Sequence, residues 1–567
     1  MTIETGHGGM VDRPVEAVGD ATEPGTLSRR MLLRRLGVVS AAAGAYVLLP
    51  GIGRASPPVT ATDIVNGLPG TAGGSDAVQT PIPFSMVGFE LSGDAGIEFR
   101  TSPDGQAWTP WTVPHRMGAD GEGPDAGSGE DSVPWRRMTH PVWVGEARWL
   151  QVRGADPREV RAHLVDSADL SRSSFASAAT TALDALVGAP TAAHAAPSQP
   201  NIVSRAGWGA DESWRSGSPR YASSARFAVI HHTATGNGYS KDDVPAIMRG
   251  MYRYHTQTLG WADLGYNFVV DKFGRVFEGR YGGIDKAVIG AHAAGYNTGS
   301  IGVAAIGNYQ VSSGEVWASM LEGFDRVVAW KFAHHGIDPY GTTQEGSRTL
   351  PTIIGHRDVG STSCPGDRFY RYVRGSEPMA ERVWLRMYGF RDVPLDSQFA
   401  RDIAWVSSMG ITRGVNPPKN DLFDPKGLVT REQMAAFLTR GLGLTDADHP
   451  GFRDVKSGST FDQDIRRIAK AGITRGANPP TNDLFRPKDV VSREQMAAFL
   501  TRGLGLTDDD HPGFRDVPKG STFDQDIRRL AKAGITRGSN PPKNDLFNPK
   551  GSVSREHMAA FLRRALT

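Results

Sequence analysis

Two histidines and the single cysteine are the residues of this chain whose types and spacing could hold a metal ion. His231 follows the apolar run 227–230, His356 lies just beyond the strand-like run 349–354, and Cys364 lies eight residues beyond His356. Two imidazoles and one thiolate are a zinc ligand set that leaves a fourth position for water. Zinc in such a site lowers the pKa of water to roughly 7 and polarises a carbonyl. The spacing alone fits two structural histidines and a core cysteine equally well, so both interpretations stay open here.

The elements around these residues predict an α/β domain with a mixed sheet over residues 201–380. We expect strands at 227–230, 300–306 and 349–354, and a hairpin whose strands 266–270 and 276–278 flank Asp-Lys-Phe-Gly. Apolar spacing predicts helices at 244–259 and 317–334. Because side chains converge where the strands of such a sheet end, His231 and His356 are expected to meet. His232 should point to the opposite face from His231.

The length and composition indicate a chain of several globular domains. It has 567 residues, of which 39% are apolar and 22% charged, with 68 glycines and 37 prolines that indicate many turns. The net charge is only +2, which argues against nucleic acid as a partner. A single cysteine excludes an internal disulfide.

The N-terminal segment has the pattern of an export signal. Ser-Arg-Arg-Met-Leu-Leu-Arg-Arg at 28–35 is followed by an apolar run at 36–49 and by small residues. Arg29 and Arg30 resemble a twin-arginine signal, so we expect residues 1–55 to direct secretion by that route. The apolar run is shorter than the ~20 residues that span a bilayer, so no stable membrane span is expected after cleavage.

Residues 56–170 combine short strand-like runs with turn clusters, which predicts a small β-sandwich-like domain. The acidic, glycine-rich stretch 118–132 is expected to be a long loop, and we find no catalytic set in this domain. Its tryptophans are expected to pack in the core, with a carbohydrate platform as the alternative. Residues 171–200 are rich in Ala, Ser and Pro and predict a linker.

The last third of the chain is an internal repeat. Phe-Arg-Asp-Val starts at Phe390, Phe452 and Phe514, at equal intervals that define units 390–451, 452–513 and 514–567. Each unit predicts two helices joined by a loop rich in Pro, Asn and Asp, and the three should pack on one another. Thr430 with Gln433, and Ser492 with Gln495, predict capping boxes, whereas His557 departs from the box in the third copy.

Residues of about 201 to 375 resemble the peptidoglycan recognition proteins and the phage amidase lysozymes of the same fold. The resemblance rests on motifs spread along the domain: Ser-Arg-Ala-Gly-Trp-Gly at 204–209, Phe-Ala-Val-Ile-His-His-Thr-Ala at 227–234, Gly-Tyr-Asn-Phe at 265–268, and Gly-Ala-His-Ala-Ala-Gly-Tyr-Asn at 290–297. It implies one catalytic Zn²⁺ held by His231, His356 and Cys364. It also implies that peptidoglycan is the substrate.

The same resemblance implies roles for further residues. Tyr266 matches the family's catalytic tyrosine, and Thr362 matches a position that holds Thr or Lys in active members. For these two, a core tyrosine and a turn-stabilising hydroxyl are the alternatives. His255, His292 and Asn297 resemble groove positions that contact substrate or pack. A related amidase class carries a glutamate where this chain has Ala304, so no glutamate base is assigned.

The three repeats resemble S-layer homology modules, which implies attachment to a secondary cell-wall polymer. Arg431, Arg493 and Arg555 match that family's binding arginine, and a guanidinium suits an acidic sugar. The alternative is that each arginine caps or pairs within its own turn of helix. The usual tryptophan of the first helix is replaced by Phe399, Phe461 or Phe523.

These inferences combine into a multidomain fold: an N-terminal all-β sandwich-like domain, a central α/β mixed-sheet amidase domain, and C-terminal, mostly α S-layer homology repeats. The expected function is a secreted zinc-dependent N-acetylmuramoyl-L-alanine amidase that acts at the cell wall and cell surface. It would cut the amide between the lactyl group of muramic acid and L-alanine. The alternatives are a non-catalytic peptidoglycan-binding protein of the cell surface and a structural surface-layer protein.

Overall fold

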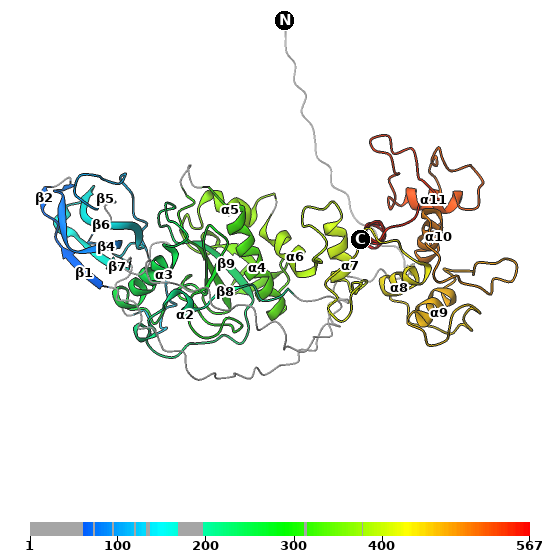
Figure 1. The fold of residues 1–567 in the computed structure, drawn as a ribbon, viewed down its shortest axis with the longest axis horizontal. Helices are drawn as coiled ribbons and strands as arrows, with labels where there is room; N and C mark the ends of the chain where they lie inside the picture. The colour runs from blue at the N-terminus through cyan, green and yellow to red at the C-terminus, as the bar shows by residue number, and fades with distance from the viewer. Residues whose placement is uncertain are drawn as a thin grey trace, which may run out of the picture. The chain divides into compact units, whose positions relative to one another are not determined.

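The computed structural model describes residues 61–71, 74–92, 96–117, 121–131, 137–167, 197–310, 315–376 and 378–567 (Figure 1). The predicted export signal at 1–55 and nearly all of the predicted linker 171–200 lie outside the described residues. Within the described ranges, no helix has the length and apolar character needed to cross a bilayer.

The N-terminal domain is built from β-strands, as predicted, but its described strands form one sheet rather than two. The 14-residue strand β4 pairs with both β6 and β7, and this joins the strands into the order β1-β7-β4-β6-β3-β2, with β5 also on β6. Apolar side chains of β4, β6 and β7 form the core. The strands are β1 (Ala61–Asn66), β2 (Gly70–Thr71), β3 (Gly74–Ser75), β4 (Val78–Leu91), β5 (Glu98–Ser102), β6 (Val142–Arg153) and β7 (Val160–Asp166).

The central domain has the mixed sheet that the sequence predicts. Its order is β15-β9-β12-β10-β11-β8, with β10 and β11 antiparallel and the other neighbours parallel. The predicted strand 349–354 is two elements, because β14 (Arg348–Pro351) pairs with β13 (Thr342–Glu345) and only β15 (Ile353–Gly355) joins the main sheet. The remaining strands are β8 (Ile202–Val203), β9 (Phe227–His232), β10 (Phe268–Val270), β11 (Val276–Glu278) and β12 (Ser300–Ala305).

Helices cover both faces of this sheet. The predicted helices are α3 (Val244–Arg253), which continues into a π-helical turn at Tyr254–Thr258, and α4 (Ala318–His335). Ala228 and Ile230 of β9 pack with α4 in one apolar cluster, and α3 belongs to a second cluster. Because strand side chains alternate, His231 faces away from α4. The described residues of the domain also form α2 (Arg205–Trp208), α5 (Asp367–Arg374) and α6 (Met379–Tyr388), and short 3-10 helices at Glu212–Trp214 and His356–Asp358.

Each C-terminal repeat contributes two helices, as predicted, and all three repeats share one apolar core. The capping boxes of Thr430 and Ser492 are confirmed, and in the third copy Ser554 accepts the His557 N–H without a complete box. The helices are α7 (Ala400–Ser408), α8 (Arg431–Gly441), α9 (Asp462–Lys470), α10 (Arg493–Gly503), α11 (Asp524–Lys532) and α12 (Arg555–Leu566).

The three repeats close into a ring through equivalent arginines. Nε of Arg431 donates to the Phe485 carbonyl at 2.7 Å, which joins the first repeat to the second. Arg493 makes the same bond to the third repeat, and Arg555 of the third repeat returns to Phe423 of the first at 2.6 Å. Each guanidinium also lies over a phenylalanine ring. These arginines therefore connect neighbouring repeats, and their binding of a wall polymer stays a prediction.

Candidate metal centre and active site

The three predicted metal ligands meet at the end of two neighbouring strands. His231 lies in β9, and His356 follows Gly355, which pairs with Ile230 of β9 in parallel register. One ligand atom each of His231, His356 and Cys364 lies within 4.8 Å of the others, and all three residues are buried. The carboxyl ends of parallel strands thus bring together side chains that are more than a hundred residues apart in sequence.

The geometry and chemistry of this cluster fit a zinc ion. Bond lengths in tetrahedral zinc sites place neighbouring N and S ligands about 3.6 Å apart, and Sγ of Cys364 lies 3.8 Å from Nδ1 of His231. The other nitrogen of that ring, Nε2, lies 3.0 Å from Nδ1 of His292, a contact that orients a ligand imidazole. Burial lowers the pKa of His231 well below its usual value, which keeps the ring neutral, as a ligand must be.

Tyr266 lies beside the cluster, as the resemblance implied. Its ring centroid is 5.4 Å from that of His231, and its side chain is buried. The hydroxyl donates a 2.5 Å hydrogen bond to Oε1 of Glu122, a residue of the N-terminal domain. Thr362 is half-buried, and its hydroxyl oxygen accepts the Cys364 N–H at 3.1 Å. The structure thus shows the turn-stabilising contact of Thr362, and its action on substrate stays a prediction.

The three predicted groove residues are buried and hydrogen-bonded. Asn297 Oδ1 accepts the backbone N–H groups of His292 at 2.7 Å and Ala293 at 3.0 Å, which fixes the loop that carries His292. His255 lies in the π-helical turn, where its Nδ1 accepts the Gly265 N–H at 3.2 Å. His232 is not part of the cluster, in agreement with the sequence, because its Nδ1 accepts the Tyr309 N–H on the other side.

Sequence reasoning missed Glu122 and its partner His140. The carboxylate of Glu122 is 2% exposed and lies 2.9 Å from Nε2 of His140. Burial acts to raise the pKa of Glu122, but the interactions with neighbouring histidines, first of all the charge and the hydrogen bond of His140, outweigh it and hold that pKa well below its ordinary value. The only signal in the sequence was the acidic, glycine-rich stretch 118–132, and composition alone does not say what such a loop contacts.

The buried His255 makes stability depend on pH. Burial lowers the pKa of His255 to about 3 from its usual 6.5. In the unfolded chain His255 binds a proton below about pH 6.5, whereas in the folded chain it does so only near pH 3. The stability of the fold therefore decreases as the pH drops from about 6.5 towards about 3. In His255→Asn the amide oxygen can still accept the Gly265 N–H without titrating. We expect this variant to lose less stability than the wild type between about pH 7 and about pH 4.5. Urea midpoints at both pH values measure this, and equal losses in the two chains would refute it.

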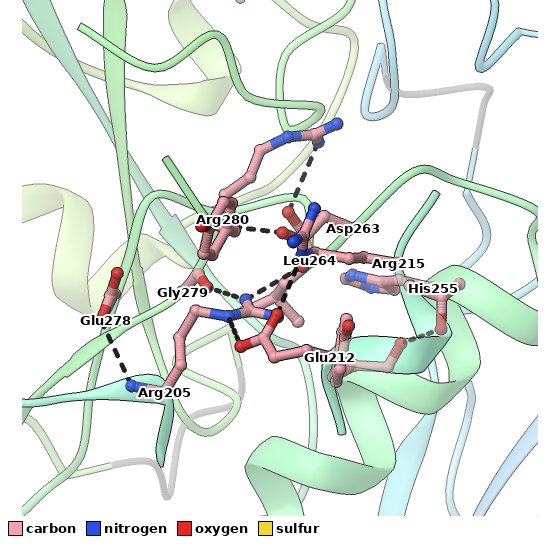
Figure 2. Close-up of polar contacts among 12 residues, drawn as sticks. Arg205, Glu212, Arg215, His255, Asp263, Leu264, Glu278, Gly279 and Arg280 are labelled. Atoms are coloured by element: carbon pink, nitrogen blue, oxygen red, sulfur yellow. Dashed lines mark hydrogen bonds and ion pairs between the residues drawn. The ribbon is translucent and has the colours of Figure 1, made fainter. Parts of the chain in front are cut away.

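A buried ion-pair network lies next to the turn that carries His255 (Figure 2). Arg205, 4% exposed, contacts Oε1 of Glu212 at 2.8 Å and Oδ1 of Asp263 at 3.0 Å, and it also donates to the Gly279 carbonyl. Asp263 in turn accepts the Tyr281 N–H at 2.8 Å. This network ties the segment before β9 to the loops on either side of β10 and β11.

Removal of Arg205 is expected to destabilise the central domain strongly. Arg205→Ala leaves the buried Asp263 carboxylate without its cation, which costs about 3–5 kcal/mol. Arg215→Ala is the matched control, because Arg215 pairs with the 42% exposed side chain of Glu212 and should cost less than about 1 kcal/mol. Urea unfolding followed by hydrogen exchange of residues 197–376 measures both values. Equal losses in the two variants would show that burial does not govern this network.

Comparison with known proteins adds three family matches. The family described as N-acetylmuramoyl-L-alanine amidase matches residues 221–367. The family described as Rv3811 N-terminal galactose-binding domain-like matches residues 51–198. The S-layer homology domain matches three times, at residues 389–435, 451–497 and 513–559.

Individual proteins match over the central domain. Peptidoglycan-recognition protein SC1a of Drosophila melanogaster is 34% identical over 175 residues, which are 31% of this chain and 84% of that protein. The human protein named N-acetylmuramoyl-L-alanine amidase is 35% identical over 151 residues, which are 26% of this chain and 23% of that protein. Among solved structures, Drosophila PGRP-LB is 30% identical, with a TM-score of 0.27 and coverage of 32% of this chain and 95% of that one.

Proposed function

Because this chain belongs to the family of peptidoglycan recognition proteins and N-acetylmuramoyl-L-alanine amidases, we propose that it is a zinc-dependent N-acetylmuramoyl-L-alanine amidase. The bond cut is the amide between the lactyl group of muramic acid and the L-alanine of the stem peptide. The observation that carries the proposal is the cluster of His231, His356 and Cys364, with ligand atoms within 4.8 Å and Tyr266 beside it. A protein that only bound peptidoglycan would not need this donor set.

The residues of the cluster have distinct roles in this proposal. His231, His356 and Cys364 hold the zinc, which when bound supplies a Lewis acid and lowers the pKa of water. His292 orients the His231 ring, and the His232 N–H, 3.4 Å from Sγ, donates to the Cys364 thiolate. The Tyr266 hydroxyl donates to the oxygen of the scissile carbonyl as negative charge develops on it. Thr362 holds the Cys364 turn and is a second candidate donor to the same oxygen.

The terminal regions fit an enzyme that works outside the cell. Three S-layer homology repeats support attachment to the cell wall, and a secondary wall polymer is the proposed ligand. In this proposal Arg431, Arg493 and Arg555 contribute to that site from the ring closed by the repeats. Residues 1–55 would export the chain by the twin-arginine route, which carries folded proteins and would allow zinc to bind before export.

Hydrolysis of a soluble muramyl peptide by the full-length chain tests the proposal. The zinc-loaded protein is incubated with muramyl pentapeptide, and the products are analysed by mass spectrometry with and without a chelator. We expect a pentapeptide with a free N-terminal alanine, and we expect the chelator to abolish its release. Retained binding without this product, even over long incubation, would favour the peptidoglycan-binding alternative.

A further inference from the structure

Residues 121–131 of the N-terminal domain lie across the candidate active site. On one side, the Gly121 carbonyl accepts the Ala294 N–H at 2.7 Å, and Asp125 Oδ1 accepts the Gly295 N–H at 2.8 Å. Asn297, a predicted groove residue, donates from Nδ2 to the Gly123 carbonyl at 2.9 Å and to Asp125 at 2.7 Å. These contacts fix the first half of the segment to the loop that carries His292.

The other end of the segment is held by a buried ion pair. Both carboxylate oxygens of Glu130 lie 2.6 Å from a guanidinium nitrogen of Arg280, and both residues are 8% exposed. Glu130 also accepts the Ala262 N–H at 3.1 Å. Arg280 follows β11 and Ala262 precedes β10, so this contact joins the segment to the loops beside these two strands. The segment is therefore attached to the central domain near both of its ends.

Within the first of these attachments, the Glu122 carboxylate faces the catalytic residues. It accepts the Tyr266 hydroxyl through Oε1 and lies against His140 through Oε2. It is thus placed where Tyr266 would have to meet substrate. The contact uses the hydroxyl that the proposed reaction needs.

The rest of the N-terminal domain holds the segment in this position. Met86, Met138 and Val165 of that domain share an apolar cluster with α3 and Tyr266. The Tyr254 hydroxyl donates to the Thr139 carbonyl at 2.9 Å, and the Trp143 N–H donates to the Thr235 hydroxyl oxygen at 2.6 Å. The segment is therefore part of an extensive contact rather than an isolated loop.

The segment leaves the site closed to a polymer. His231 and His356 are fully buried, Tyr266 is 1% exposed and Cys364 is 2% exposed. The scissile amide of a muramyl peptide joins a sugar to a peptide. The sugar must therefore fit on one side of the metal cluster and the peptide on the other. The cavity beside Tyr266, His140 and His255 holds only about 10 Å³, about one water molecule. The site as described has no room for a muramyl group, and Glu122 of residues 121–131 is one of the groups that fill the space beside Tyr266.

We propose that residues 121–131 are an internal inhibitory segment that occupies the substrate groove and keeps the enzyme latent until it is displaced. This inference rests on the proposed function, because it assigns the groove to muramyl peptides. The segment presents carboxylates to Arg280, to Asn297 and to the backbone N–H of Gly295. Once the segment is displaced, the same groups would bind an acidic peptide. The carboxylates of a stem peptide would therefore compete with those of the segment. Displacement by substrate or cleavage of the segment would open it.

The test loosens the two attachments without touching the catalytic residues. The full-length Asp125→Ala, Glu130→Ala chain is compared with the wild type and with an Asp76→Ala, Glu146→Ala chain, which removes the same charge from two exposed positions. Muramyl pentapeptide binding is measured by calorimetry on metal-free chains, and release of peptide with free N-terminal alanine is measured on zinc-loaded chains. We expect at least a tenfold gain in affinity and in initial rate for the first variant only.

The outcomes separate this inference from the proposed function. Tighter binding by the loosened variant without hydrolysis by any chain would retain the inhibitory segment and refute the amidase. Equal affinity in all three chains would refute the inhibitory segment, whether or not they hydrolyse the peptide. If the alanine variant does not fold, the isosteric Asp125→Asn, Glu130→Gln chain replaces it, with the same expected gain and the same refuting result. Hydrogen exchange should also rise in residues 121–131 of the loosened chain, and unchanged exchange would contradict the inference.

Discussion

Replacement of Cys364 by serine is expected to remove zinc and to lower amidase activity by more than about 100-fold. Loss of an outer-sphere partner already costs 10–100-fold in metal affinity or activity, and Cys364 supplies one of only three protein ligands. A serine hydroxyl stays protonated at neutral pH and is a poor zinc ligand, whereas the thiolate is a strong one. Zinc content per chain, measured by elemental analysis after gel filtration, is the primary measurement, and hydrolysis of muramyl pentapeptide is the second.

The neighbouring Ser363→Ala chain is the matched control for this variant. It alters the same turn but leaves all three ligand atoms, so it should retain one zinc per chain. Zinc retained at one per chain in Cys364→Ser would show that the thiolate is not a ligand. Because the cysteine is buried among His231 and His356, that result would support a merely structural cluster.

The second large effect is expected from Tyr266→Phe. A single donor to a developing oxyanion contributes about 10²–10³ in kcat, and the variant removes only the hydroxyl. Zinc content and muramyl pentapeptide affinity should not change, because the ring and the metal ligands remain. The same hydroxyl also bonds Glu122, so the comparison is made in the Asp125→Ala, Glu130→Ala background, where the segment is already loosened.

Tyr239→Phe is the control for this variant. Tyr239 is also buried, but its hydroxyl donates to the Ile306 carbonyl at 3.1 Å, away from the metal cluster. Its removal should leave kcat within a fewfold of the parent. A similar loss of kcat in both variants, or no loss in Tyr266→Phe, would mean that the Tyr266 hydroxyl does not act on the reacting carbonyl.

The proximity of His231, His356 and Cys364 could be predicted because its determinants are local. His231 and His356 each follow a short apolar strand, and Cys364 lies in a Pro-Gly turn close behind. Parallel pairing of β9 with β15 then brings both histidines to one edge of the sheet. The strand at 349–354 was harder to define, because Thr352 is the single residue between the hairpin strand β14 and strand β15 of the main sheet.

Contacts between the N-terminal and central domains could not be predicted, because they leave no periodic pattern of residues in the sequence. Glu122 and Glu130 belong to a stretch whose composition indicates only a solvated loop. Their partners Tyr266 and Arg280 lie some 150 residues further along the chain. Which surface such a loop contacts depends on how the two domains pack. Apolar residues such as Met86 and Met138 form that packing, and in the sequence they cannot be distinguished from residues of the core of a single domain.

In the repeats, too, local structure could be predicted from the sequence whereas long-range contacts could not. Equal spacing and capping residues predict the helix pair of each unit, and the left-handed Asn420, Asn482 and Asn544 mark the turn that repeats within each connecting loop. Closure of the ring is different, because it depends on the bond from Arg555 back to Phe423 across the whole array. An arginine that matches a binding position in sequence is therefore also a connector between repeats.

Digestion of intact peptidoglycan by the full-length protein tests the central claim most directly. Zinc-loaded wild type and the Asp125→Ala, Glu130→Ala chain are incubated with purified peptidoglycan, with and without chelator, and the soluble products are analysed by mass spectrometry. The account predicts stem peptides with a free N-terminal alanine, released faster by the loosened chain and not released with chelator. Peptidoglycan left uncut by both zinc-loaded chains, or cut at any other bond, would contradict it.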